Sequence, residues 1–142
     1  MLVRCLYASH AAAPVERPVV DLILLQSRRN NTVRGITGIL CHTDDTFIQV
    51  LEGGRDEVCD LFATILRDDR HRGVRILSYE EIGERRFGHW SMGQVDIARV
   101  NHALLLKYSA RAKVNPFDTP ACSTMSLLEE LLATASIISR GA

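Results

Sequence analysis

The alternation of apolar and polar residues at the start of the chain predicts a strand followed by a helix. Residues 2–8 alternate in the manner of a half-buried strand, with Tyr7 on the same face as the apolar Val3. After a loop of small residues, apolar side chains recur at helical spacing, and Pro18 suits the first turn of a helix. We therefore expect a first helix over residues 18–29.

The next part of the chain predicts a β-hairpin and a second helix. Two apolar runs, Gly35–Cys41 and Phe47–Leu51, flank a polar turn at residues 42–46. Gly53-Gly54 ends the second of these strands. The segment after it places apolar residues on one side of a helix: Val58, Leu61, Phe62 and Ile65.

Two further apolar segments predict a fourth and a fifth strand. The fourth covers residues 74–77, and its pattern can continue to Ile82, while the fifth covers residues 90–97. The resulting order is strand-helix-strand-strand-helix-strand-strand. This order predicts an α+β fold, a ferredoxin-like five-stranded mixed sheet with both helices on one face.

The predicted hairpin is apolar on both faces, because Phe47 and Leu51 point one way while Ile48 and Val50 point the other. Two helices on one side of a sheet cannot cover both faces. The rest of the chain predicts two helices and a loop between them: residues 103–113, residues 125–138 and the loop at residues 115–120.

The second of these helices carries an apolar stripe: Leu128, Leu131, Leu132, Ala135 and Ile138. We expect a C-terminal two-helix cap on the far face of the sheet. The alternative is that this stripe is a dimerisation or partner surface. The chain thus divides into residues 1–97, the sheet with its two helices, and residues 98–142, a C-terminal helical extension.

Composition and charge narrow the class of protein. The 142 residues suit one domain with a core, since 46% are hydrophobic and 24% are charged. Lys+Arg and Asp+Glu both number 17, so the net charge of +0 does not favour a nucleic-acid binder. The sequence contains neither a membrane-length apolar run nor a signal peptide. The four scattered cysteines predict free thiols in a reducing cytoplasm, and no histidine lies at metal-ligand spacing.

Gln49 is the most informative polar residue, because its neighbours on the predicted strand are all apolar. A buried amide without a partner costs about 1–3 kcal/mol, so Gln49 must be hydrogen-bonded. In a ferredoxin-like sheet the first and third strands are adjacent, so Tyr7 and Gln49 can meet on the helix-facing side. The amide is either a core glutamine satisfied by backbone or a contact to a ligand.

Asn30 and Asn31 offer a second pair of amides at the predicted end of the first helix. They either cap that helix end or present donors and acceptors to the edge of a planar heteroaromatic ligand. The glycines fit no phosphate-binding motif, and the sequence contains neither a nucleophile elbow nor a metal-binding cluster.

These residues resemble those of the BLUF family, domains that sense blue light with a bound flavin. The resemblance runs from Val3 to Val95. It is carried by several motifs in order: Tyr7 with Ser9, Ser27-Arg-Arg-Asn-Asn31, Gly35-Ile-Thr-Gly38, Phe47-Ile-Gln-Val-Leu-Glu-Gly53, Asp69-Arg-His71 and Arg86-Phe-Gly-His-Trp-Ser-Met92.

The resemblance implies a flavin between the two helices. Ile23 and Ile65 would sandwich its ring system, Asn31 would hydrogen-bond the pyrimidine edge, and Asn30 would assist nearby. Arg28 and Asp68 resemble contacts to the ribityl or phosphate side. The expected cofactor is FAD, with FMN or riboflavin as alternatives.

The photoactive residues are also implied by the resemblance. Tyr7 is similar to the family's electron and proton donor, with Ser9 beside it in the cofactor site, and Gln49 to the amide between that tyrosine and the flavin. Trp90 and Met92 resemble the two residues that compete as neighbours of the glutamine. Thr64 is a departure, since many relatives carry Arg or His there.

The chain is thus expected to be a stand-alone, non-catalytic blue-light receptor without an output enzyme. Its fifth strand would pass a hydrogen-bond change at Gln49 to the C-terminal helices, and a downstream protein partner or a homo-oligomer would respond. The expected location is the cytoplasm, without nucleic-acid or membrane binding.

The alternative from another class is an acylphosphatase-like hydrolase that uses Arg28-Arg29-Asn30-Asn31 as an anion site, although a helix C-terminus disfavours phosphate. A third reading is a ligand-free interaction module.

Overall fold

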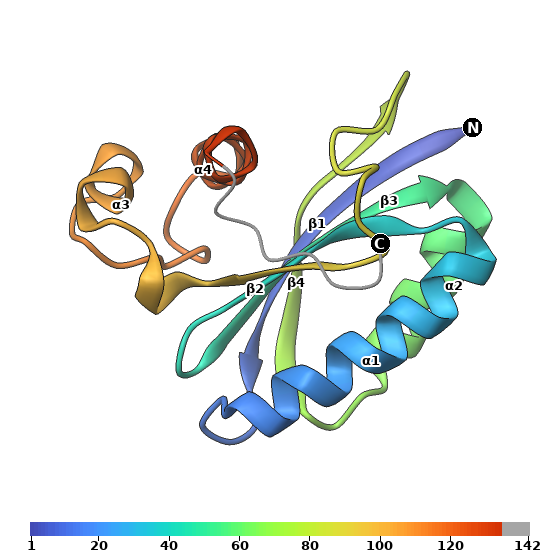
Figure 1. The fold of residues 1–142 in the computed structure, drawn as a ribbon, viewed down its shortest axis with the longest axis horizontal. Coiled ribbons are helices and arrows are strands. Elements are labelled where there is room, and N and C mark those ends of the chain that lie inside the picture. The colour runs from blue at the N-terminus through green and yellow to red at the C-terminus, as the bar shows by residue number, and fades with distance from the viewer. Residues whose placement is uncertain (135–142) are drawn as a thin grey trace.

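A computed structural model of the chain describes residues 1–134 and shows one sheet between two helical layers (Figure 1). The elements are β1 (Leu2–Ala11), α1 (Arg17–Arg34), β2 (Thr37–His42), β3 (Thr46–Gly54), α2 (Arg55–Leu66), β4 (His71–Ile82), β5 (Gly93–Asp96), a 3₁₀ turn (Ile97–Arg99), α3 (His102–Tyr108) and α4 (Ala121–Ala133). Helices α1 and α2 lie on one face of the sheet, and α3 and α4 lie on the other.

The five strands form one mixed sheet in the order β4-β1-β3-β2-β5. All neighbouring strands are antiparallel except β2 and β5, which are parallel. In the β1–β3 ladder Tyr7 lies directly opposite Gln49. The structure confirms the predicted ferredoxin-like α+β fold.

A close approach between β2 and β3 fixes the position of the hairpin. A Cβ atom on Gly38 would lie 1.9 Å from the carbonyl oxygen of Val50, so the backbones can approach this closely only at a glycine. The same ladder places Leu40 opposite Gln49. The central strand therefore has a fixed register on both sides of the glutamine.

The first helix is longer than the predicted residues 18–29. It continues past Asn30 and Asn31 and ends at Gly35, whose backbone is left-handed (φ 67°) and whose N–H bonds to the carbonyl groups of Asn31 and Thr32. Glycine adopts this conformation without a steric penalty and therefore ends helices well. Of the two alternatives for the asparagine pair, the cap of the helix end is therefore wrong.

The fourth and fifth strands also differ in length from those predicted. β4 continues to Ile82, as its pattern allowed, but begins earlier, at His71, because it pairs with β1 along its length at the sheet edge, where polar side chains can face solvent. β5 covers only part of residues 90–97, since its pairing with β2 begins at Gly93 and Ile97 starts a 3₁₀ turn.

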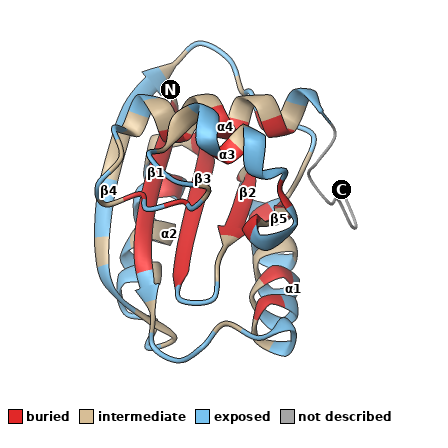
Figure 2. Ribbon diagram, turned by 90° about the vertical axis from the view of Figure 1, so that its left-hand side faces the viewer, coloured by how far each residue is buried: buried red, intermediate tan, exposed pale blue. Residues whose placement is uncertain are grey.

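The C-terminal helices cover the far face of the sheet, as expected. Ile48 and Val50 of β3 share a buried core with Leu127, Leu128 and Leu131 of α4. Figure 2 shows the buried strands β1, β3 and β2 behind α3 and α4, while β4 is largely exposed. The division of the chain at residue 97 stays a prediction.

The two cap helices have other limits than those predicted. α3 ends at Tyr108 instead of residue 113, and the exposed Arg111 and Lys113 that follow it lie outside the helix. α4 begins at Ala121 instead of residue 125, directly after Pro120, because proline suits a helix start. Ala135 and Ile138 of the predicted stripe lie outside the described residues.

All four cysteines are free thiols, with Cys5 and Cys41 buried and Cys59 and Cys122 exposed. Within residues 1–134, no helix has both the length and the apolar character needed to cross a membrane.

Truncating the cap core should destabilise the whole domain. Leu131 on α4 is fully buried against the sheet, so Leu131→Ala should lower the free energy of unfolding by about 2–5 kcal/mol. Leu106→Ala on α3 is the control, because that side chain is 53% exposed and its loss should change stability by less than about 0.5 kcal/mol. Urea unfolding of both variants measures the difference. Equal stabilities would mean that α4 contributes little to the fold.

Candidate functional site

A cavity opens between α1 and α2, on the face of the sheet that these two helices cover. Its wall combines apolar, amide and charged side chains from every part of that layer: Tyr7, Ile23, Gln26, Ser27, Asn30, Asn31, Leu40, Phe47, Gln49, Leu61, Thr64, Ile65, Asp68, Arg70 and His71. Such a mainly apolar cleft with a few converging polar groups is typical of a small-molecule site.

Tyr7 and Gln49 line this cavity and form a buried chain of contacts with Met92, which lies outside the cavity wall. The Tyr7 hydroxyl donates to Gln49 Oε1, and Gln49 Nε2 donates to Met92 Sδ at 3.4 Å. All three residues are at most 4% exposed. The partners of the glutamine amide are thus side chains from β1 and from the residue before β5. Burial raises the pKa of the Tyr7 phenol, which stays protonated at neutral pH.

Asn31 contributes a buried acceptor to the cavity wall. Its side chain is 1% exposed, and its Nδ2 donates to the Ser91 carbonyl at 3.2 Å. Its Oδ1 is buried as well, and no hydrogen-bond partner lies within its reach among the described residues. Because a buried unpaired acceptor costs free energy, this atom fits a ligand that carries an N–H group. The neighbouring Asn30 also lines the cavity but is exposed.

The two helices provide apolar side walls. Ile23 of α1 and Ile65 of α2 both line the cavity, as do Leu61 of α2, Leu40 of β2 and Phe47 of β3. These side chains contain no polar group beyond the backbone. They suit a flat ring system held between the helices by apolar contact.

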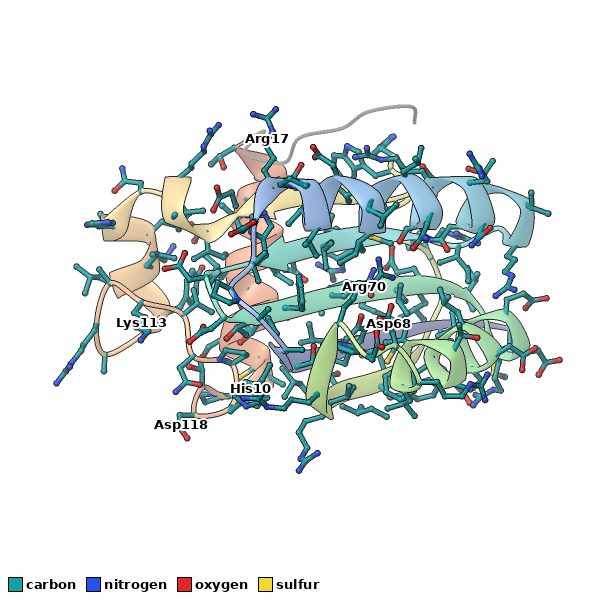
Figure 3. All side chains as sticks on the ribbon, turned by 90° about the horizontal axis from the view of Figure 1, so that it is seen from below. His10, Arg17, Asp68, Arg70, Lys113 and Asp118 are labelled. Carbon is teal, nitrogen blue, oxygen red and sulfur yellow. The ribbon has the colours of Figure 1, made fainter. Side chains whose placement is uncertain are left out.

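The loop between α2 and β4 makes one end of the cavity polar. Arg70 Nε bonds both carboxylate oxygens of Asp68 at 3.0 Å, and Arg70 Nη2 donates to Gln26 Oε1 of α1 at 3.2 Å. Figure 3 shows Asp68 and Arg70 between α1 and α2. The hydrogen bonds from Arg70 hold the pKa of the Asp68 carboxyl below its ordinary value. This ion pair is therefore charged at neutral pH.

His71 connects α2 to β1 at the cavity wall. Its Nε2 lies 2.6 Å from the Ile65 carbonyl and its Nδ1 lies 2.7 Å from Ser9 Oγ. Because a carbonyl only accepts, Nε2 carries the proton, and a neutral ring then accepts at Nδ1 from the serine hydroxyl. Ser9 is fully buried and supports His71 instead of lining the cavity.

Besides Ser9, three predicted site residues lie outside the cavity wall: Arg28, Trp90 and Met92. Trp90 packs against the core on the far face of the sheet, so Met92 and not Trp90 is the neighbour of Gln49. Arg28 donates from Nε to the Met92 carbonyl at 3.0 Å and is outside the cavity wall. The Arg28–Asn31 run lies inside α1 instead of forming an anion-binding loop, which removes the main support for an acylphosphatase-like site.

Sequence reasoning missed several wall residues as parts of the site: Gln26, Ser27, Leu40, Phe47, Leu61, Arg70 and His71. Gln26 recurs at helical spacing with Ile23, and Phe47 alternates with Gln49, so periodicity alone indicates their faces. Arg70 and His71 belong to a run of mixed charge that is typical of a solvated loop. No periodic signal places them at a cavity.

Comparisons with known proteins identify the family of the chain. Residues 2–93 match the family model "BLUF: Sensors of blue-light using FAD". Among curated proteins, photoactivated adenylate cyclase subunit beta of Euglena gracilis is 33% identical over 87 residues, 61% of this chain and 10% of that protein. The blue light- and temperature-regulated antirepressor BluF of Escherichia coli (strain K12) is 31% identical over 99 residues, 68% of this chain and 24% of that protein. The chain thus spans a small part of these relatives.

Two solved structures match nearly end to end. BlsA in its photo-activated state is 34% identical with a TM-score of 0.82, covering 93% of this chain and 95% of that chain. BlrB in its dark state is 30% identical with a TM-score of 0.74, covering 94% of this chain and 96% of that one. These matches do not support the acylphosphatase-like alternative. The chain belongs to the BLUF family of blue-light sensors that use a flavin.

Proposed function

We propose that this chain binds one noncovalent flavin, with FAD preferred, in the cavity between α1 and α2, and that light changes the hydrogen bonds of Gln49. The observation that carries the proposal is the buried contact chain from Tyr7 and Gln49 in the cavity wall to Met92 beyond it. A phenol, a reorientable amide and a soft sulfur acceptor in that order form a set of partners that can exchange donor and acceptor roles.

The residues of the cavity fit a flavin. The edge of its pyrimidine ring carries one N–H between two carbonyl groups. This N–H would donate a hydrogen bond to Asn31 Oδ1 and so supply the partner that this buried atom lacks among the described residues. Ile23 and Ile65 would hold the ring faces, with Asn30 near the ring edge. Asp68 alone would repel a phosphate, but the adjoining Arg70 offsets that charge, so this end suits a ribityl chain or a phosphate.

The protein side of the switch follows from the acidity of a phenol and the asymmetry of an amide. A flavin bound in this cavity would supply a group that absorbs blue light and, when excited, an acceptor for one electron. When Tyr7 loses an electron, its hydroxyl becomes far more acidic, and the proton moves to its partner, Gln49 Oε1. The amide can then rotate or tautomerise before the electron and proton return to Tyr7. The contact from Gln49 Nε2 to Met92 Sδ is the one that we expect this change to alter.

The output of this sensor is proposed to be conformational and not catalytic. The Euglena relatives are named photoactivated adenylate cyclases and the Escherichia coli relative is named an antirepressor, so relatives of this sequence are coupled to different activities. For this chain we propose a cytoplasmic sensor, homo-oligomeric, whose C-terminal cap is read by a downstream protein partner. Neither nucleic acid nor a membrane is part of the proposal.

The visible spectrum tests the proposal directly. Purified protein should be yellow and carry a single noncovalent flavin per chain, and blue light should shift its absorption band reversibly to longer wavelength. Release of the flavin by denaturation, followed by chromatography, identifies FAD, FMN or riboflavin. A folded, colourless protein that takes up none of the three added flavins would overturn the proposal.

A further inference from the structure

Glu52 is a fully buried carboxylate that the proposed switch does not use. It lies on β3, the strand that carries Gln49, and is 0% exposed. Its Oε2 accepts from Arg4 Nε at 2.8 Å and from the Arg86 backbone N–H at 3.1 Å, while Oε1 accepts from the Phe87 N–H at 2.7 Å. Arg4 balances its charge, and the other two bonds hold the backbone of a distant loop.

That loop joins β4 to β5 and covers residues 83–92. Its middle is fixed to the sheet, because Glu52 holds the backbone at Arg86 and Phe87 and the Phe87 ring is fully buried in the far-face core. Its end reaches the switch, because Met92 Sδ accepts from Gln49 Nε2. One loop is thus attached at two points to residues of the same strand.

The loop also contacts the cap. Arg86 Nη1 donates to Glu129 Oε1 of α4 at 2.8 Å. The two side chains are 54% and 36% exposed, so the ion pair lies at the surface and its loss should leave the fold intact. A path of direct contacts therefore runs from Gln49 through the 83–92 loop to α4.

We propose that the 83–92 loop passes the light-driven change at Gln49 to α4, with Glu52 as its positioning residue and the Arg86–Glu129 ion pair as its output contact. The inference rests on the proposed function. Gln49 and Glu52 lie on one strand that is paired on both sides, so we expect a changed Gln49–Met92 contact to be taken up between Phe87 and Met92, next to Arg86. The competing route follows the chain through β5 and the Ile97–Arg99 turn into α3.

Two adjacent glutamates distinguish the two routes. Glu129 pairs with Arg86 of the loop, whereas Glu130 bonds Lys107 and Tyr108 of α3. Glu129→Gln and Glu130→Gln remove the same charge from the same helix, so each is the matched control of the other. The readouts are the visible spectrum and backbone amide exchange of residues 121–134, in the dark and under blue light.

The wild type should show faster exchange in α4 under light. Glu129→Gln should keep a full, reversible spectral shift but lose this light-dark difference, while Glu130→Gln should keep both. The exchanged pair, Arg86→Glu with Glu129→Arg, should restore the difference. A wild type without the spectral shift would overturn the proposed function. Two results would overturn the loop route alone. One is a wild type with a normal spectral shift but no light-dark difference in the amide exchange of α4. The other is a Glu129→Gln variant that keeps the full light-dark difference.

Glu52→Gln tests the positioning role. Glutamine offers one acceptor oxygen where three donors now bond, so the amides of Arg86 and Phe87 should exchange faster in the dark, while amides of β1 and β3 stay protected. The spectral shift should persist and the light response of α4 should shrink. Unchanged protection of Arg86 and Phe87 would refute the role of Glu52. If this variant does not fold, Glu52→Asp tests the same role, since it keeps the charge beside Arg4 but withdraws the carboxylate from the Arg86 and Phe87 backbone N–H groups.

Discussion

Gln49→Leu should abolish the reversible light-induced shift of the flavin band while the protein keeps its fold and its flavin. Leucine is close to glutamine in size and suits the apolar neighbours of this 4% exposed position, but it can neither accept from Tyr7 nor donate to Met92. Tyr7→Phe should have the same effect, because it removes the phenol that supplies the electron and the proton. Gln49→Leu leaves the Tyr7 hydroxyl and the Met92 sulfur without their partner, and Tyr7→Phe leaves Gln49 Oε1 without its donor, so each change should lower stability by about 1–3 kcal/mol.

The spectral test has matched controls in the chain. Tyr79 lies on the edge strand β4 with 39% of its surface exposed, and Gln94 lies on β5 beside His42, outside the cavity. Tyr79→Phe and Gln94→Leu make the same chemical changes away from the proposed switch and should show the wild-type shift. Difference spectra before and after blue illumination compare the four variants. An unchanged reversible shift in Gln49→Leu or Tyr7→Phe would contradict the assignment of that residue.

The residues on regular elements could be placed from the sequence. Alternation puts Tyr7 and Gln49 on the same side of their strands, and the order of elements makes those strands neighbours, so their contact follows from the pattern. The two-sided apolarity of residues 47–51 likewise predicts a second covering layer, which α4 supplies. Periodicity and strand order are sufficient to place such residues, because a short-range sequence pattern determines which face of its strand or helix each one occupies.

The residues on loops could not be placed in the same way. Trp90 and Met92 both precede β5, and only the path of the 83–92 loop sends Trp90 to the far face and Met92 to Gln49. That path depends on the bonds of Glu52 to Arg86 and Phe87, which join residues far apart in the sequence. Local pattern carries no information on such long-range contacts.

Flavin retention should depend strongly on Asn31. Its buried Oδ1 has no partner among the described residues, and a flavin N–H is the donor that we propose for it. Asn31→Ala should therefore weaken flavin binding by about 1–3 kcal/mol, or roughly 5- to 150-fold in Kd. The same substitution also removes the hydrogen bond from Asn31 Nδ2 to the Ser91 carbonyl, which can lower the stability of the protein. The unfolding curve of the variant is therefore measured together with its flavin affinity.

Asn30 is the control that tells a specific hydrogen bond to the flavin edge from a general effect of removing a polar side chain from the cavity wall. Asn30 lines the same cavity but is exposed, so water already satisfies its amide and Asn30→Ala should weaken retention far less. Fluorescence titration of flavin-free protein with FAD gives both affinities under one condition. Because alanine at position 31 removes an acceptor that has no partner among residues 1–134, we expect the larger loss there. Equal affinities for the two variants, with both proteins folded, would mean that the flavin does not hydrogen-bond Asn31.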